Sequence, residues 1–85
     1  MRGMNPTIQN PYAAAVRSLA GDLLGYLRLP GGTMPSEFDY ALFDLWAKAD
    51  EINREGIEAG WPVVAFVLRA HDLDGEDGLY RIAGN

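Results

Sequence analysis

Residues 36–57 read SEFDYALFDLWAKADEINREGI, and this stretch carries the longest helical pattern in the chain. Ser36 stands just before the apolar residues, and Asp39 follows three positions later. That spacing is typical of a capping box, with Asp in place of the usual Glu or Gln. Acidic residues in the first turn are also favoured by the helix dipole. The stretch therefore predicts one continuous helix that starts after Ser36.

This predicted helix has two apolar faces. At about 100° per residue, one face carries a stripe that is typical of a core-facing helix, formed by Phe38, Leu42, Leu45, Ala49 and Ile52. The opposite face carries Tyr40, Phe43 and Ala47, where a surface helix is normally polar. Two interpretations stay open: either the chain's own C-terminal segment covers this second face, or a partner does. Aromatic side chains are frequent anchors of interfaces, so we take these three residues as candidate contacts.

A second helical pattern covers residues 11–29, after the start signal Asn10-Pro11. Residues 4–10 are predicted to be an irregular arm, and residues 1–3 are interpreted as an expression remnant. Small residues line up on one face of this helix, at Ala14, Ser18, Gly21 and Gly25. Either the helix merely tolerates these glycines, or this face is a groove against which another segment packs. In the second case a two-fold homodimer would place the aromatic rings of one copy on the small residues of the other.

The C-terminal part has a different pattern. Residues 63–68 read VVAFVL, which is typical of a buried strand. An acidic segment with two glycines follows at 72–78, and residues 79–83 are a candidate return strand. We therefore predict an α+β fold in one small domain, residues 4–85, with an antiparallel two-helix hairpin followed by a C-terminal β-hairpin. An all-α three-helix domain, with a third helix that begins at Pro62, stays open because periodicity does not separate the two for a short apolar run.

Composition narrows the classes of function. The chain has 85 residues, no cysteine and a net charge of −5. This charge disfavours direct binding of nucleic acid and suits basic patches on other proteins. The sequence shows no apolar run of the length of a membrane span and no signal peptide, so we expect a cytoplasmic protein without membrane insertion.

The sequence contains no complete catalytic or metal-binding motif. The acidic segment that starts at Asp72 lacks the glycine and the glutamate that an EF-hand loop requires at its sixth and twelfth positions. His71 is the only histidine, and no phosphate-binding glycine loop or nucleophile motif accompanies it. We therefore predict no catalytic residue, no metal and no cofactor.

The leading functional hypothesis is a small acidic, non-enzymatic module that binds another, larger protein. It would act as an inhibitor or regulator, in the style of phage or mobile-element accessory proteins, and would form a homodimer. One alternative is an acidic nucleic-acid mimic that blocks a nucleic-acid-binding enzyme. A third, weaker hypothesis is a small metal-dependent enzyme.

Overall fold

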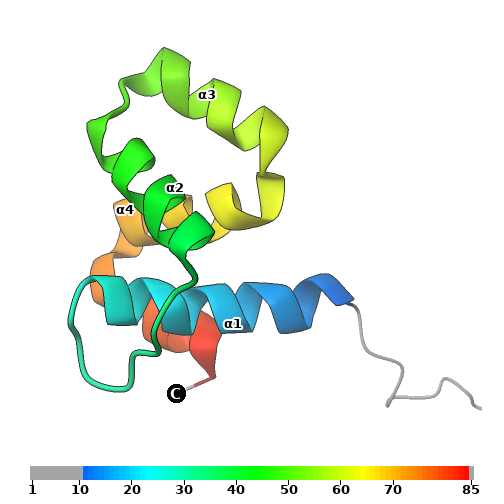
Figure 1. The fold of residues 1–85 in the computed structure, drawn as a ribbon. Coiled ribbons are helices and arrows are strands. Elements are labelled where there is room, and N and C mark those ends of the chain that lie inside the picture. The colour runs from blue at the N-terminus through cyan, green and yellow to red at the C-terminus, as the bar shows by residue number, and fades with distance from the viewer. Residues whose placement is uncertain (1–10, 85) are drawn as a thin grey trace, which may run out of the picture.

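The computed structural model describes residues 11–84, which form four helices and no strand (Figure 1). The helices are α1 (Pro11–Tyr26), α2 (Glu37–Lys48), α3 (Glu51–Gly60) and α4 (Pro62–Ala83). The predicted α+β fold with a C-terminal β-hairpin is therefore wrong, and the described part of the chain is all-α. The predicted arm at residues 4–10 and the remnant at 1–3 lie outside the described residues.

The apolar run that was predicted to be a strand forms the first turns of α4. Pro62 occupies a first-turn position, where its missing N–H costs no hydrogen bond and its fixed φ suits a helix. The alternative helix that begins at Pro62 is thus confirmed, in a domain of four helices rather than three. Val64, Ala65, Val67 and Leu68 are all buried. Burial against other helices overrides the β-propensity of the valines, since that propensity depends strongly on context.

The predicted acidic loop at residues 72–78 is helical on both sides of one kink. Gly75 has φ 65° and ψ −151°, which only glycine adopts readily, and the helix axis changes direction there. A Cβ on Gly78 would lie 2.9 Å from the carbonyl oxygen of Ala70, so the chain needs a glycine to pack this closely. After the kink the last turns of α4 lie against α1, with Leu79 fully buried (Figure 1).

The stretch 36–57 is two helices rather than one. Ser36 caps α2 as predicted, because its hydroxyl accepts a hydrogen bond from the backbone N–H of Asp39 at 3.1 Å. The helix then ends, as Ala49 is extended at ψ 141°. Asp50 starts α3 by accepting a hydrogen bond from the N–H of Asn53 at 2.9 Å. The new start changes the direction of the helix, so the apolar stripe predicted along one continuous helix does not exist.

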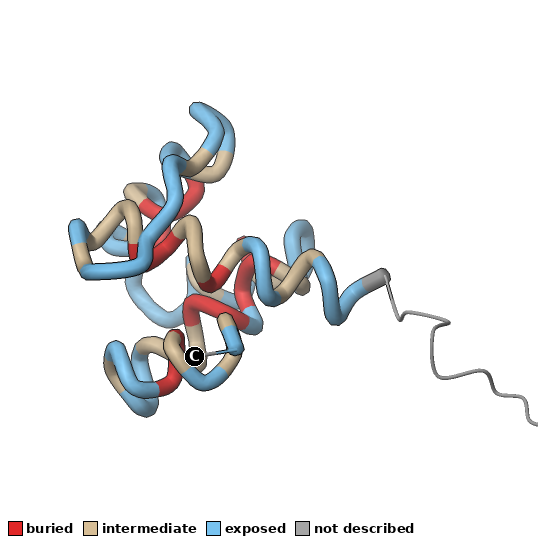
Figure 2. Tube along the Cα trace, turned by 90° about the horizontal axis from the view of Figure 1, so that it is seen from below, coloured by how far each residue is buried: buried red, intermediate tan, exposed pale blue. Residues whose placement is uncertain are grey.

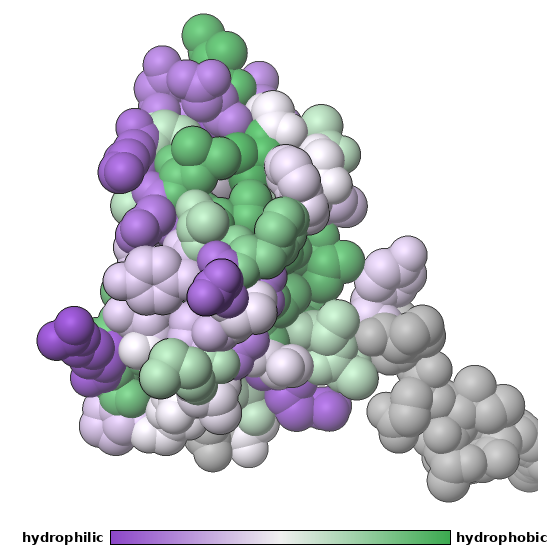
Figure 3. All heavy atoms as spheres, viewed as in Figure 1, coloured by the Kyte–Doolittle hydropathy of each residue, from purple (hydrophilic) through white to green (hydrophobic). Residues whose placement is uncertain are grey.

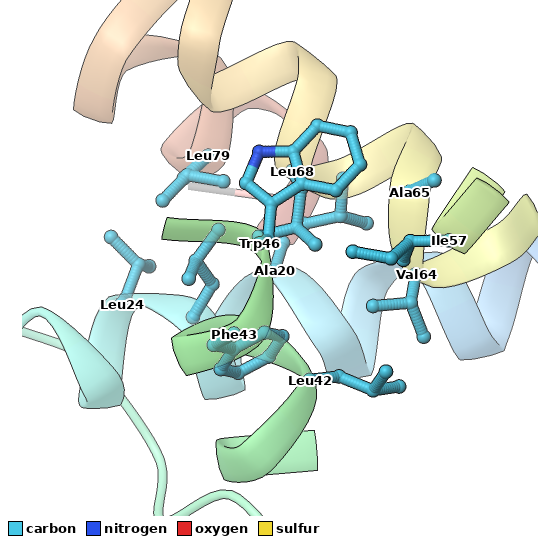
Figure 4. Packing of buried hydrophobic residues seen from close by; sticks show 12 residues of the cluster. Ala20, Leu24, Leu42, Phe43, Trp46, Ile57, Val64, Ala65, Leu68 and Leu79 are labelled. Carbon is cyan, nitrogen blue, oxygen red and sulfur yellow. The ribbon is translucent and has the colours of Figure 1, made fainter. Parts of the chain in front are cut away.

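One hydrophobic core joins the four helices (Figures 2 and 4). Its buried members are Ala20, Leu23, Leu24, Leu42, Phe43, Trp46, Ile57, Val64, Ala65, Val67, Leu68 and Leu79. Leu42 was correctly placed in the core. Leu45 and Ile52 were not, since their exposed fractions are 50% and 79%. Phe43, which the prediction placed on the opposite face, and Trp46 are the aromatic residues that α2 buries.

The link between α1 and α2 packs tightly on the glycine face of α1. The N–H of Thr33 donates to the carbonyl of Gly21 at 3.0 Å, and its hydroxyl donates to Asp22 at 2.6 Å. A Cβ on Gly25 would lie 1.7 Å from the carbonyl oxygen of Thr33. The Gly21–Gly25 spacing therefore lets another backbone approach closely, as one interpretation proposed, but that backbone belongs to the same chain.

Gly25→Ala is expected to destabilise the protein by about 1–3 kcal/mol, because the added methyl group has to push away backbone rather than a flexible side chain. Gly60→Ala is the matched control, since a Cβ there meets nothing within 4 Å. The control is expected to keep or raise stability by up to about 1 kcal/mol. Urea denaturation followed by circular dichroism measures both, and equal stabilities would contradict the packing described for Thr33.

Candidate functional site

α2 and α3 meet at their ends but make little contact along their length (Figure 1). At one end they are joined by the two residues Ala49 and Asp50. At the other end Phe38 of α2 lies against Trp61, which follows α3, with their ring centroids 5.9 Å apart. A hollow lies between the two helices and is lined by residues of both.

This hollow is a pocket with a volume of about 390 Å³. Small ligands and anchoring side chains bind in pockets of roughly 300–1,000 Å³. We call it the α2–α3 pocket, and its lining residues are Leu45, Lys48, Ala49, Asn53, Gly56, Ile57 and Trp61. Most of this lining is apolar, while Lys48 and Asn53 supply the polar groups.

Large apolar side chains stay exposed around the pocket. Phe38, Leu45 and Trp61 have exposed fractions of 56%, 50% and 42%. Ile52, one residue before the lining residue Asn53, is more exposed still. Figure 3 shows the resulting hydrophobic area over α2 and α3, bordered by hydrophilic side chains. Contiguous apolar surface with a polar border is typical of an interaction site rather than of ordinary protein surface.

Gly56 lies in the wall of the pocket, and nothing in the described chain requires a glycine there. A Cβ at this position meets no atom within 4 Å, in contrast to Gly25 and Gly78. Glycine inside a helix costs about 1 kcal/mol relative to alanine. Gly56 leaves the wall of α3 without a side chain, so a bound molecule can approach the helix backbone directly.

A polar network holds the pocket's α3 wall to the rest of the fold. The indole N–H of buried Trp46 donates to Asp72 at 3.1 Å, and Arg54 of α3 donates to the same carboxylate oxygen at 2.8 Å. The guanidinium of Arg54 also donates to the Trp46 carbonyl and lies 4.7 Å from the centre of its ring. Residues of α2, α3 and α4 thus meet around one indole.

Arg69 of α4 braces α3 at two further points. Its guanidinium donates to both carboxylate oxygens of Glu51, at 3.0 and 2.7 Å, and to Glu58 at 3.2 Å. These hydrogen bonds lower the pKa of Glu51 and raise the pKa of Arg69. Glu51 and Glu58 stand at the two ends of α3, so this helix is held along its full length.

The candidate contact residues named from the sequence do not share one surface. Phe43 is 1% exposed, and its ring lies 5.4 Å from that of Tyr26 inside the protein's own core. Tyr40 and Ala47 are exposed. On α1, Ala14 and Ser18 are exposed as well, but Thr33 covers the face at Gly21 and Gly25. The rings of a second copy therefore cannot dock on those two glycines, and homodimer formation through the exposed residues stays a prediction.

None of those seven residues lines the α2–α3 pocket. The signal that was missed is Asp50 itself, because Asp is a preferred residue at a helix start and its carboxylate accepts from the backbone N–H three residues later. A break there turns Leu45 and Ala49 from core positions into pocket walls.

Within residues 11–84, no three His, Asp or Glu side chains form an arrangement that could hold a metal ion. In the same part of the chain, no helix combines the length and the apolar character needed to cross a bilayer. Comparison of the chain with protein-family models, curated proteins and solved structures gave no match.

Proposed function

We propose that this protein is a non-enzymatic binding module, and that its α2–α3 pocket takes apolar side chains of a partner protein. The observation that carries the proposal is an apolar pocket with Gly56 in its wall, lined by exposed Leu45 and Trp61 with exposed Phe38 beside it. Aromatic and aliphatic residues around a preformed pocket are what protein-binding hot spots use.

The physical gain from such binding comes from burying apolar surface. Each Å² of apolar surface removed from water contributes about 25 cal/mol. A partner that covers the pocket also covers the rings at its border. Since α3 is already fixed by Arg54 and Arg69, little ordering of the binding surface is needed, and more of this gain appears as affinity.

Gly56→Leu is expected to abolish binding while the fold survives. The leucine side chain would enter the pocket from its wall, where a Cβ meets no atom, and would occupy the space of the partner's side chain. Helix propensity predicts an unchanged or slightly higher stability, by up to about 1 kcal/mol. Peptides selected on the wild-type protein from a displayed random library serve as probes, with Kd measured by fluorescence anisotropy.

Ala47→Leu is the matched control, because it places the same leucine side chain on an exposed site of α2 that does not line the pocket. We expect this variant to bind the selected peptides as the wild type does. Equal binding by Gly56→Leu, or loss of binding only in Ala47→Leu, would place the contact elsewhere and overturn the proposal.

The second candidate is the acidic mimic of nucleic acid. The observation that favours it is the negative charge of residues 37–60, which contain seven acidic residues and two basic ones. Against it, Glu51 and Glu58 both pair with Arg69, whose single positive charge offsets one of their two negative charges. A mimic would bind its partner mainly through ion pairs, so its affinity would fall steeply between low and physiological salt. Binding through the apolar pocket would keep most of its affinity at physiological salt, because salt does not screen the burial of apolar surface.

A further inference from the structure

The α2–α3 pocket differs from the rest of the molecule in charge as well as in shape. Residues 37–60 hold seven of the twelve acidic residues and two of the seven basic ones, a net charge of −5. The whole chain also has a net charge of −5, so the remaining residues balance to zero. All of the net negative charge therefore belongs to the two helices that form the pocket and the short link between them.

Three exposed carboxylates are direct sequence neighbours of residues that line or border the pocket. Glu37 precedes Phe38 at one end, Asp50 follows Ala49 at the other, and Glu55 precedes Gly56 between them. None of the three forms an ion pair with another side chain of residues 11–84. Lys48 also lines the pocket, which leaves three negative charges against one positive charge. A cationic border on the partner is thus favoured over an anionic one.

The walls of the pocket also restrict the backbone conformation of the partner. Both walls are helices, whose interior N–H and C=O groups are already paired, so they offer no ladder for an extended peptide. An extended segment would lay unpaired backbone groups on the apolar walls, which is costly. A helical segment satisfies its own backbone groups and presents apolar side chains at i, i+3, i+4 and i+7. The bare wall at Gly56 gives such a helix room to approach.

We infer that the occupant of the α2–α3 pocket is a basic amphipathic helix of a partner protein. This inference rests on the proposed function and specifies the partner's chemistry. The helix would insert its apolar stripe between α2 and α3 and direct Lys or Arg side chains to Glu37, Asp50 and Glu55. Nucleic acid and anionic membrane surfaces, which carry the same sign of charge as this face, are excluded as occupants of the pocket.

The test uses three synthetic peptides, each about four helical turns long. The first has leucines at i, i+3, i+4 and i+7 with lysines on its other face. The second is its acidic twin, with glutamates in place of the lysines. The third has the composition of the first with the leucines spread around the helix.

Kd is measured by anisotropy at physiological salt for the full chain and for two variants, Gly56→Leu and the triple variant Glu37→Gln, Asp50→Asn, Glu55→Gln. Asn is also a good helix N-cap, so Asp50→Asn is expected to preserve the start of α3.

We expect the basic peptide to bind at least about ten-fold more tightly than both other peptides, because three exposed ion pairs change sign in the acidic twin. Gly56→Leu should weaken its binding by at least about ten-fold. The triple variant should reduce the difference between the basic peptide and its acidic twin.

Other outcomes distinguish a failure of this inference from a failure of the proposed function. If the basic and acidic peptides bound equally well and Gly56→Leu abolished both interactions, the partner would not need to be basic. The inferred charge of the partner would then be wrong, while the proposed function would stand. Binding of the basic peptide that Gly56→Leu does not weaken would show attraction by surface charge alone, and it would overturn both. Failure of all three peptides, while library-selected peptides still bind at the pocket, would overturn the helical partner.

Discussion

Phe43→Glu is expected to unfold the protein. The side chain of Phe43 is buried in the core between α2 and α1, with its ring edge-on to that of Tyr26. A carboxylate in that position would be buried without a cation or a hydrogen-bond donor dedicated to it, which is among the most destabilising kinds of substitution. A domain of this size has a total stability at the low end of about 5–15 kcal/mol, so one such change removes most of it.

The matched control is Ala47→Glu, one helical turn further along α2 on an exposed site. This variant is expected to stay within about 1 kcal/mol of the wild type. Circular dichroism melts compare the two proteins directly. A cooperative melt of Phe43→Glu near the wild-type temperature would show that this ring is accessible, as the sequence-based contact hypothesis required.

Trp46→Ala is expected to cost about 3–5 kcal/mol, the range for removing a large buried aromatic side chain. Trp46 is 3% exposed and fills the space between α2, α3 and α4. The change also removes the N–H donor to Asp72 and the ring beside the Arg54 guanidinium. The substitution therefore loosens the attachment of α3 as well as the core.

Leu45→Ala is the control for Trp46→Ala, and here the structure reverses an expectation from the sequence. The helical pattern alone predicts a core position for Leu45 and a cost of about 2–5 kcal/mol. Because half of this side chain is exposed, we now expect less than about 1 kcal/mol. Urea denaturation of both variants gives the comparison. If Leu45→Ala proved the more costly of the two, the assignment of Leu45 to the pocket wall would be wrong.

The parts of the fold that were predictable from sequence depend on local signals. The Ser36 cap with Asp39 three residues later correctly gave the start of α2, since both hydrogen-bonding groups lie within one turn. The Pro30–Gly31 segment was also a local signal, and it correctly indicated that the first helix ends before it. The helix stops a few residues earlier than predicted, at Tyr26, and Arg28 just after it adopts a positive φ of 61°. These features need no knowledge of distant residues.

The parts that were not predictable depend on contacts between distant residues. The run at 63–68 has strand-like composition, yet it is a helix because α1 and α3 supply the surfaces that bury it. The same holds for Gly25, where only glycine fits because the backbone of Thr33 in the following link lies against it. The pocket was missed because Asp50 was assigned to a helix interior, although Asp is a common residue at helix starts.

The packing of α1 against α4 has a consequence for how the chain folds. These two helices make more contacts with each other than any other pair, although they are the first and the last elements of the described chain. Contacts between residues far apart in sequence slow folding, because the chain loses entropy in closing the loop before the contacts form. We therefore expect slower folding than in helical bundles of similar length with local contacts. During synthesis on the ribosome, the part of α1 that packs against α4 therefore stays uncovered until α4 has emerged.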